Sequence, residues 1–284
     1  MVDFAFLDSG TGGIPYMLGL LKLCPQASCV YVGDTVHFPY GEKTHQQIVG
    51  FVVELVEKVI NRFSPSVIVI ACNTMSVNAL NVLREVYPDQ QFVGTVPAIK
   101  LAATVSKKRR IGLLATKATV ENPYNQDLKN HFASDCDLVL RGDPDLISFI
   151  EHKSFTATQE ERENACKPAV EFFRKENCDV IILGCTHFLN MKEEMQSVCG
   201  NDITVVDSVE GVVNRALSLK RALRDELEND VPALGVAEKT GACEDFGAQG
   251  AFPLLFVTGF CDKKDEKEYD VLCKRYSITF GGKL

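Results

Sequence analysis

The sequence contains no apolar run that approaches the ~20 residues a helix needs to cross a bilayer. Its first four residues, Met-Val-Asp-Phe, lack the basic segment that begins a secretory signal peptide. The 284 residues carry a formal net charge of −8, which argues against nucleic acid or an anionic membrane surface as the main partner. We therefore expect a cytoplasmic protein whose partner is a small molecule.

Cysteine pairs of the Cys-x-x-Cys type are also absent, although the chain has 11 cysteines. An odd number of cysteines without that spacing is untypical of a disulfide framework, a zinc ribbon or a thioredoxin-type redox centre. Most of these cysteines are expected to be reduced core residues. Hydrophobic residues make up 46% of the chain and charged residues 24%, which indicates a globular protein long enough for two domains.

Two short stretches of the chain, 67–74 and 180–187, resemble each other. Each is a run of β-branched and aliphatic residues, typical of a strand buried on both faces, followed by a small residue, a cysteine and polar residues. In an open α/β sheet, ligands bind beyond the carboxyl ends of the strands. Cys72 and Cys185 are therefore both expected at such an edge, with one substrate held between them.

The segments around these two strands repeat as well. The strands expected at 4–7 and 30–32 correspond to those at 111–114 and 138–140, at nearly constant spacing from the cysteine strands. An internal duplication is the economical explanation. We therefore predict an α/β fold with two similar doubly wound, mostly parallel-sheet domains and an active site in the cleft between them.

The predicted first domain comprises residues 1–97 and 211–284, and the second comprises 98–210. The tail is expected to return to the first domain. Turn residues and apolar periodicity predict helices at 46–63 and about 76–86, and in the tail a helix at about 210–227, a Gly-rich surface loop at 235–250, a last strand at 254–258 and a helix near 265–275.

Two thiols at one edge could support several kinds of chemistry. A nucleophilic site needs only one cysteine and a base, thiols on separate domains are poorly suited to redox exchange, and a metal bound by Cys72, Cys185 and His187 would lack a specified fourth ligand. Acid–base chemistry fits best, because inverting a stereocentre requires one group to remove a proton from one face and another to deliver one to the opposite face. An unperturbed thiol pKa of ~8.5 lets one thiol be ionised while its partner is protonated.

Each thiol has a candidate tuning partner in the sequence. Asp8 ends the first strand and could polarise Cys72, and His187 could do the same for Cys185. Glu151, soon after the repeated Gly-Asp turn, is a further candidate. Taken singly, each has an ordinary explanation as a helix cap or a satisfied polar residue, and a cysteine after a buried strand is usually a core residue. The duplicated context favours a function for the pair.

Several short motifs, in order along nearly the whole chain, carry a family resemblance: 8–13, 33–34, 39–41, 72–74, 114–116, 184–188 and 256–259. With them the chain resembles the glutamate racemases of the cofactor-independent aspartate/glutamate racemase superfamily. The resemblance implies glutamate between two α/β domains, Cys72 and Cys185 as the acid–base residues, no pyridoxal phosphate and no metal. It also implies D-glutamate for peptidoglycan as the product.

The resemblance further implies which residues contact the substrate. They are Asp8, Ser9, Pro39, Tyr40, Gly41, Asn73, Thr74, Thr116, Thr186 and His187. The sequence leaves a homodimer open. It also leaves open an aspartate or hydantoin racemase with the same two thiols, and a non-catalytic binding module for a dicarboxylic amino acid.

Overall fold

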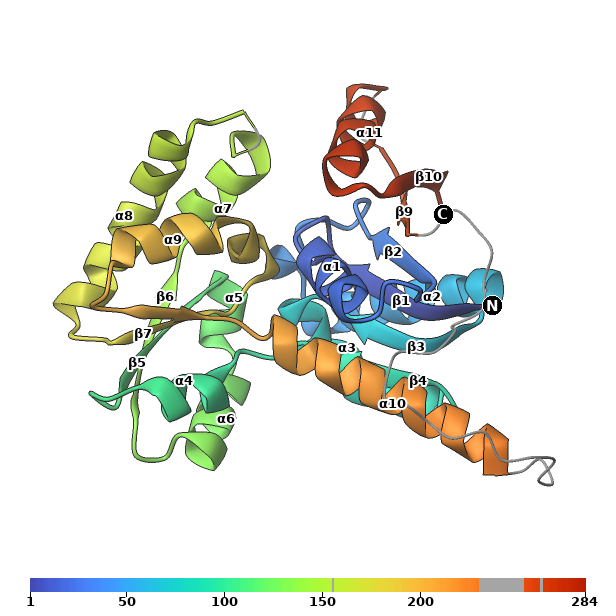
Figure 1. The fold of residues 1–284 in the computed structure, drawn as a ribbon, viewed down its shortest axis with the longest axis horizontal. Helices are drawn as coiled ribbons and strands as arrows, with labels where there is room; N and C mark the ends of the chain where they lie inside the picture. Colours follow the sequence, from blue (N-terminus) through green and yellow to red (C-terminus); the bar gives the residue numbers. More distant parts are fainter. Residues whose placement is uncertain (155, 230–252, 261–262) are drawn as a thin grey trace.

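The computed structural model of the protein describes residues 1–154, 156–229, 253–260 and 263–284 (Figure 1). The surface loop expected at 235–250 lies outside the described residues. Within the described part of the chain, no helix combines the length and apolar character needed to cross a membrane.

The first of two sheets has the strand order β10-β9-β2-β1-β3-β4 in the described residues. Neighbouring strands are parallel throughout. The strands are β1 (Val2–Asp8), β2 (Cys29–Gly33), β3 (Pro65–Ile70), β4 (Gln91–Gly94), β9 (Leu254–Val257) and β10 (Thr279–Lys283).

The second sheet has the order β6-β5-β7-β8 and is also parallel. Its strands are β5 (Arg110–Ala115), β6 (Asp137–Gly142), β7 (Val180–Leu183) and β8 (Thr204–Val206). The order β2-β1-β3-β4 within the first sheet is the same pattern, as an internal duplication requires. In both sheets the first strand is an inner one. The second strand lies on one side of it and the third strand on the other side, which is the doubly wound arrangement. The predicted fold class is confirmed.

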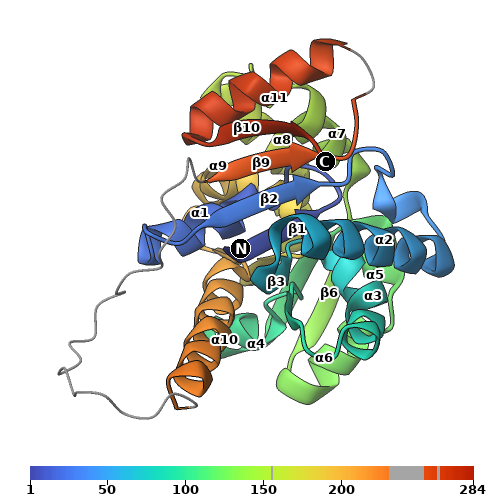
Figure 2. The same cartoon turned by 90° about the vertical axis from the view of Figure 1, so that its right-hand side faces the viewer.

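Helices cover both faces of the first sheet (Figure 2). On β1, Phe4 and Phe6 face the core shared with α1, α10 and α11, whereas Ala5 and Leu7 face the core shared with α2 and α3. This alternation follows from the two-residue period of a strand, and it makes β1 apolar on both sides. The helices are α1 (Ile14–Leu23), the 3₁₀ helix η1 (Tyr40–Glu42), α2 (His45–Phe63), α3 (Asn73–Val86), α10 (Val209–Asn229) and α11 (Lys263–Tyr276).

The second sheet has the same layered organisation. One face packs against α7, α8 and α9, and the other packs against α4 and α6 (Figure 1). The helices of this half are α4 (Ile99–Val105), α5 (Lys117–Glu121), α6 (Tyr124–Phe132), α7 (Pro144–His152), α8 (Gln159–Lys175), the 3₁₀ helix η2 (Thr186–Met191) and α9 (Lys192–Cys199).

Strands β9 and β10 extend the first sheet beyond β2, so this part of the tail joins the first half of the chain. The domain boundaries at 97/98 and 210/211 stay a prediction. β10 is a strand that the sequence did not predict, because its two glycines, Gly281 and Gly282, and a register shift beside them obscure the strand pattern.

The helix expected from about residue 76 begins earlier in the structure. Asn73 is the first residue of α3, and Cys72 is its N-cap with extended backbone angles. No side chain accepts a capping hydrogen bond there, so the usual sequence signal for a helix start is missing. The consequence is that Cys72 lies at the junction of a buried strand and a helix N-terminus.

Candidate active site

The two cysteines occupy equivalent places in the two halves. Cys72 follows β3 by two residues and precedes α3, and Cys185 follows β7 by two residues and precedes η2. Both are mostly buried, with 5% and 6% of their surface exposed. The duplicated strand–cysteine units therefore place both thiols at carboxyl ends of parallel strands, as predicted.

The loop after β1 meets the loop that carries Cys185 across the two halves. Gly12, in the loop after β1, packs so closely on the other half that a Cβ on it would lie 2.7 Å from Thr186 Oγ1 and 3.0 Å from His187 N. Gly41 similarly faces Thr116, and the ring of Phe38 lies 6.1 Å from that of His187. The carboxyl edges of the two sheets thus meet at these loops.

Cys72 lies in a buried polar environment supplied by the first half. Its Sγ is 3.7 Å from Ser9 Oγ. Burial and then the negative charge of Asp8 raise the pKa of the Cys72 thiol above its ordinary value, and the charge of Cys185 acts in the same direction.

Asp8 is fully buried, and both of its carboxylate oxygens accept hydrogen bonds. The backbone N–H of Ser9 donates to Oδ1 at 2.7 Å, while the backbone N–H of Gly13 and the hydroxyl of Tyr31 donate to Oδ2 at 2.7 and 2.9 Å. Asp8 therefore anchors the glycine-rich loop after β1 and places a negative charge near Cys72. The sequence analysis missed Tyr31, whose signal was a phenol within a strand buried on both faces.

Cys185 lies in a chain of three ionisable groups. His187 Nδ1 is 3.3 Å from Cys185 Sγ, and His187 Nε2 is 2.9 Å from Glu151 Oε1. Burial alone lowers the pKa of His187, but the charges and hydrogen bonds of Cys185 and Glu151 outweigh it and raise this pKa well above its ordinary value. The structure thus brings together the three residues that the sequence named separately.

Tyr40 is buried beside the site and is held by an aspartate outside the predicted set. Its hydroxyl donates to Asp34 Oδ2, which is also 2.8 Å from His37 Nδ1, and the Thr258 hydroxyl donates to Asp34 Oδ1 at 2.7 Å. Burial and then the charge of Asp34 raise the pKa of Tyr40. Asp34 was visible in the sequence only as part of the repeated Gly-Asp turn.

The remaining predicted residues lie in the segments that follow β2, β3 and β5. Asn73 and Thr74 form the first turn of α3, Thr116 caps α5, and Pro39 precedes η1. Asn73 Oδ1 is buried and has no hydrogen-bond partner among the described residues. An unpaired buried acceptor costs free energy unless a ligand satisfies it. This oxygen is therefore a candidate contact for a bound substrate.

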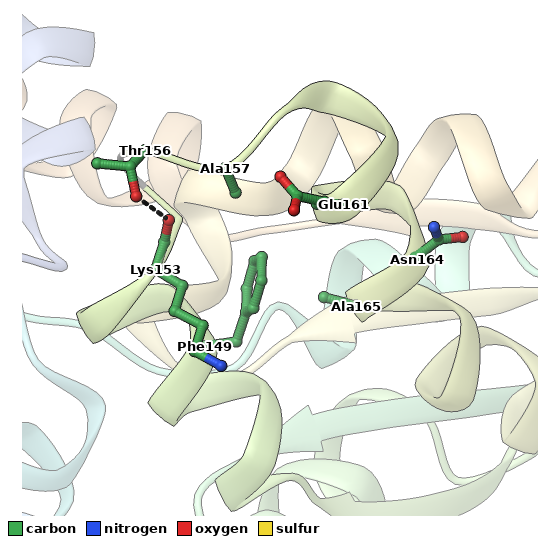
Figure 3. Close-up of a pocket in the computed structure, with 7 residues that line it drawn as sticks. All are labelled: Phe149, Lys153, Thr156, Ala157, Glu161, Asn164 and Ala165. Carbon is green, nitrogen blue, oxygen red and sulfur yellow. Dashed lines mark hydrogen bonds between the residues drawn. The ribbon is translucent and has the colours of Figure 1, made fainter.

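A cavity of about 480 Å³ lies elsewhere, between α7 and α8 (Figure 3). It is lined from α7, α8 and the loop between them, and the ring of Phe149 forms part of its wall. None of the predicted site residues lines it. In the described part of the chain, no group of three or more His, Cys, Asp and Glu side chains is arranged to hold a metal ion.

Comparison with known proteins gives the family of the chain. The family model described as Asp/Glu/Hydantoin racemase matches residues 19–216 of the chain. The chain belongs to this family. As a member of the Asp/Glu/hydantoin racemase family, it is an enzyme of the isomerase class.

Individual relatives agree with the family assignment. The chain is 43% identical over 217 residues to a glutamate racemase of Treponema pallidum (strain Nichols), covering 76% of this chain and 81% of that protein. It is 38% identical over 221 residues to a glutamate racemase of Shewanella sp. (strain MR-7), covering 77% and 79%.

Solved structures of this family share the fold. The Escherichia coli glutamate racemase, determined with L-glutamate and the activator UDP-MurNAc-Ala, superposes with a TM-score of 0.81 at 30% identity and covers 100% of this chain and 98% of that one. Glutamate racemase isoform RacE1 of Bacillus anthracis superposes with a TM-score of 0.77 at 24% identity, covering 99% and 97%, and supports the fold.

Proposed function

We propose that the protein interconverts L- and D-glutamate without a cofactor, by moving the Cα proton between Cys72 and Cys185 on opposite faces of the substrate. The observation that carries the proposal is the contact of the loop after β1, whose Ser9 lies beside Cys72, with the residues that follow Cys185, each thiol being supplied by a different sheet. Two acid–base groups facing each other are the geometry that inversion at a carbon requires.

The environments of the two thiols support different roles at rest. Burial and Asp8 favour the protonated form of Cys72, so this thiol is the proton donor. His187, held by Glu151, can donate a hydrogen bond from Nδ1 to the sulfur of Cys185, which suits Cys185 to the role of base. For substrate of the other hand the two thiols must exchange these protonation states.

The substrate assignment to glutamate follows the names of the relatives. Asn73 Oδ1 is a suitable acceptor for the substrate ammonium, and the positive end of the α3 dipole suits its carboxylate. Burial of the site supports proton transfer at a weakly acidic carbon, because oriented donors act more strongly where water is excluded.

The proposal also includes the biosynthetic use of the product and the cellular compartment in which it is made. D-glutamate would supply peptidoglycan synthesis in the cytoplasm. The nine cysteines among the described residues are free thiols, which suits a reducing compartment.

The test is incorporation of solvent deuterium at Cα of L- and D-glutamate by the purified protein without added cofactor. Cys72→Ser and Cys185→Ser are each expected to abolish racemisation, because each removes the only acid–base group on one face. Each variant should still eliminate HCl from a chlorinated glutamate of one hand. Racemisation at the parental rate by either variant would contradict the two-base assignment.

Aspartate is the informative competing substrate, because it is one methylene shorter than glutamate and the pocket must distinguish the two. Faster racemisation of aspartate or of a hydantoin than of glutamate would overturn the substrate assignment but keep the two-thiol mechanism. Tight binding of glutamate without any exchange at Cα would overturn both.

A further inference from the structure

The ion pair between Glu151 and His187 joins two elements that are separate in the sequence. Glu151 lies in the last turn of α7, and His187 is the second residue of η2. Their 2.9 Å contact, and with it the orientation of His187 toward Cys185, exists only while α7 and η2 keep their relative position. Whatever fixes these two elements therefore matters for one thiol of the pair.

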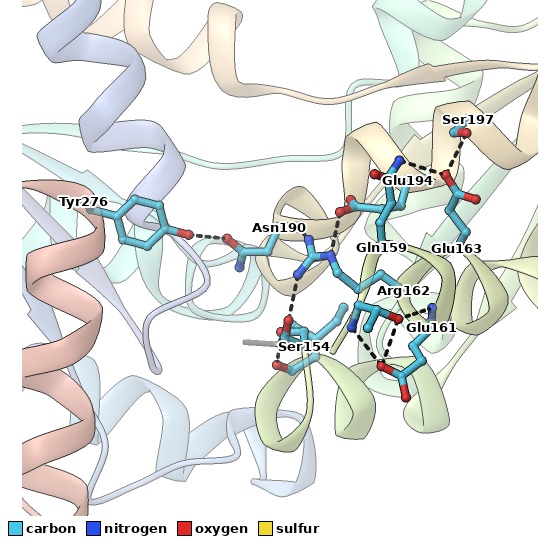
Figure 4. Close-up of polar contacts among 11 residues, drawn as sticks. Ser154, Gln159, Glu161, Arg162, Glu163, Asn190, Glu194, Ser197 and Tyr276 are labelled. Atoms are coloured by element: carbon cyan, nitrogen blue, oxygen red, sulfur yellow. Dashed lines mark hydrogen bonds and ion pairs between the residues drawn. The ribbon is translucent and has the colours of Figure 1, made fainter. Parts of the chain in front are cut away.

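Arg162, in the first turn of α8, binds both elements at once (Figure 4). Its Nη1 donates to the carbonyl of Ser154, just after α7, at 2.9 Å, and its Nη2 donates to the carbonyl of Asn190, in η2, at 2.6 Å. Its Nε pairs with Glu194 Oε1 at 2.5 Å. The Arg162 and Glu194 side chains are only 13% and 15% exposed, so water screens this contact weakly.

The two carbonyls that Arg162 binds are rigidly connected to the catalytic side chains. Ser154 follows Glu151 by three residues, and its backbone N–H and hydroxyl donate back into α7, to the carbonyls of Phe149 at 3.0 Å and Ile150 at 2.6 Å. Asn190 follows His187 by three residues within the same 3₁₀ helix. A guanidinium group donates in a fixed planar fork, so it sets a distance between two acceptors that a flexible lysine would not.

We propose that Arg162 is a positioning residue for catalysis, holding the end of α7 and η2 at the separation at which Glu151 orients His187 toward Cys185. This inference rests on the proposed function. Arg162 is not among the residues that contact the thiols. Cys72 takes its partners, Ser9 and Asp8, from the first half of the chain. The effect of Arg162 is therefore confined to the Cys185 face of the substrate.

The test compares Arg162→Gln with a matched control, Arg174→Gln. Arg174 lies on the same helix but donates to the carbonyls of Val198 and Cys199 at the end of α9, at 3.4 Å each. The assay is elimination of HCl from each hand of a chlorinated glutamate, in which a thiolate takes the Cα proton as chloride leaves Cβ. The hand that Cys185→Ser no longer processes defines the Cys185 face.

We expect Arg162→Gln to slow elimination from the Cys185 hand by about 10- to 100-fold and from the other hand by less than about twofold, the cost of a small misplacement of a catalytic group. Arg174→Gln should change neither. Equal losses for both hands, or no loss, would overturn the proposal. If Arg162→Gln does not fold, the double variant Arg162→Gln/Glu194→Gln carries the same test, because it leaves no unpaired buried carboxylate.

A second measurement needs no substrate. The Nε2 proton of His187, hydrogen-bonded to Glu151, should give a downfield proton NMR signal that His187→Asn removes. We expect Arg162→Gln to broaden or abolish this signal and Arg174→Gln to keep it, whereas an unchanged signal in Arg162→Gln would contradict the positioning role. If the parent protein acts on neither hand, the proposed function fails, and this signal still decides whether Arg162 positions His187.

Discussion

Gly12 makes a close contact between the two halves of the site, and this contact can be tested with a single methyl group. In Gly12→Ala the new Cβ would lie 2.7 Å from Thr186 Oγ1 and 3.0 Å from His187 N, whereas ordinary van der Waals contact begins at 3.4 Å. Gly12 is not among the glycines with positive φ, so alanine meets no backbone strain there. The effect should therefore come from the contact and not from the loop itself.

In Gly12→Ala the new methyl group would clash partly with backbone atoms of Thr186 and His187, and a side-chain rotation cannot relieve that clash. The loops must separate by about half an ångström, and this displaces Cys185 and His187 relative to Cys72. Since a misplacement of about 1 Å can cost roughly 100-fold in rate, we expect kcat/KM for glutamate to fall by about tenfold. The melting temperature should change little, because the sheets and their cores are untouched.

A racemisation assay monitored by circular dichroism measures the loss of kcat/KM directly. Gly50→Ala is the matched control, because Gly50 lies inside α2 and a Cβ there would meet no atom within 4 Å. This control should keep the parental rate and raise the free energy of unfolding by about 0.5–1 kcal/mol through helix propensity. Parental activity in Gly12→Ala would refute the reasoning, since the reaction would then not depend on the close contact between the loop after β1 and the loop that carries Cys185.

Two further predictions concern the buried carboxylates. Glu151→Gln removes a charged hydrogen bond from His187 and should cost about 1.5–3 kcal/mol of transition-state stabilisation, which lowers kcat/KM roughly 10- to 150-fold. Because Glu151 raises the pKa of His187, the variant should lose the His187 proton at lower pH, and an NMR titration showing no downward shift would contradict this. Asp34→Asn leaves at least one donor among Tyr40, His37 and Thr258 without an acceptor and should lower the free energy of unfolding by about 1–3 kcal/mol. Denaturant unfolding measures this, and an unchanged midpoint would show that these donors find other partners.

Much of this fold could be predicted because its signals are local. A run such as 67–70 is apolar at every position, as a parallel strand covered by helices must be, and the recurrence of that run before Cys185 exposed the duplication. The start of α3 and the strand β10 escaped prediction. The start of α3 lacks a capping side chain, and β10 is rich in glycine. Neither therefore has the residue pattern from which a helix start or a strand is recognised in a sequence.

The sequence by itself determined which residues are candidates for acid–base chemistry, because side-chain type and position after a strand are properties of the chain alone. It named Cys72, Cys185, His187 and Glu151 but did not determine which of them touch. Only the tertiary structure decided that Glu151 reaches Cys185 through His187, and that Arg162 fixes the two elements involved. The physical reason is that these contacts join separate elements, and their distances are set by how helices pack on the second sheet.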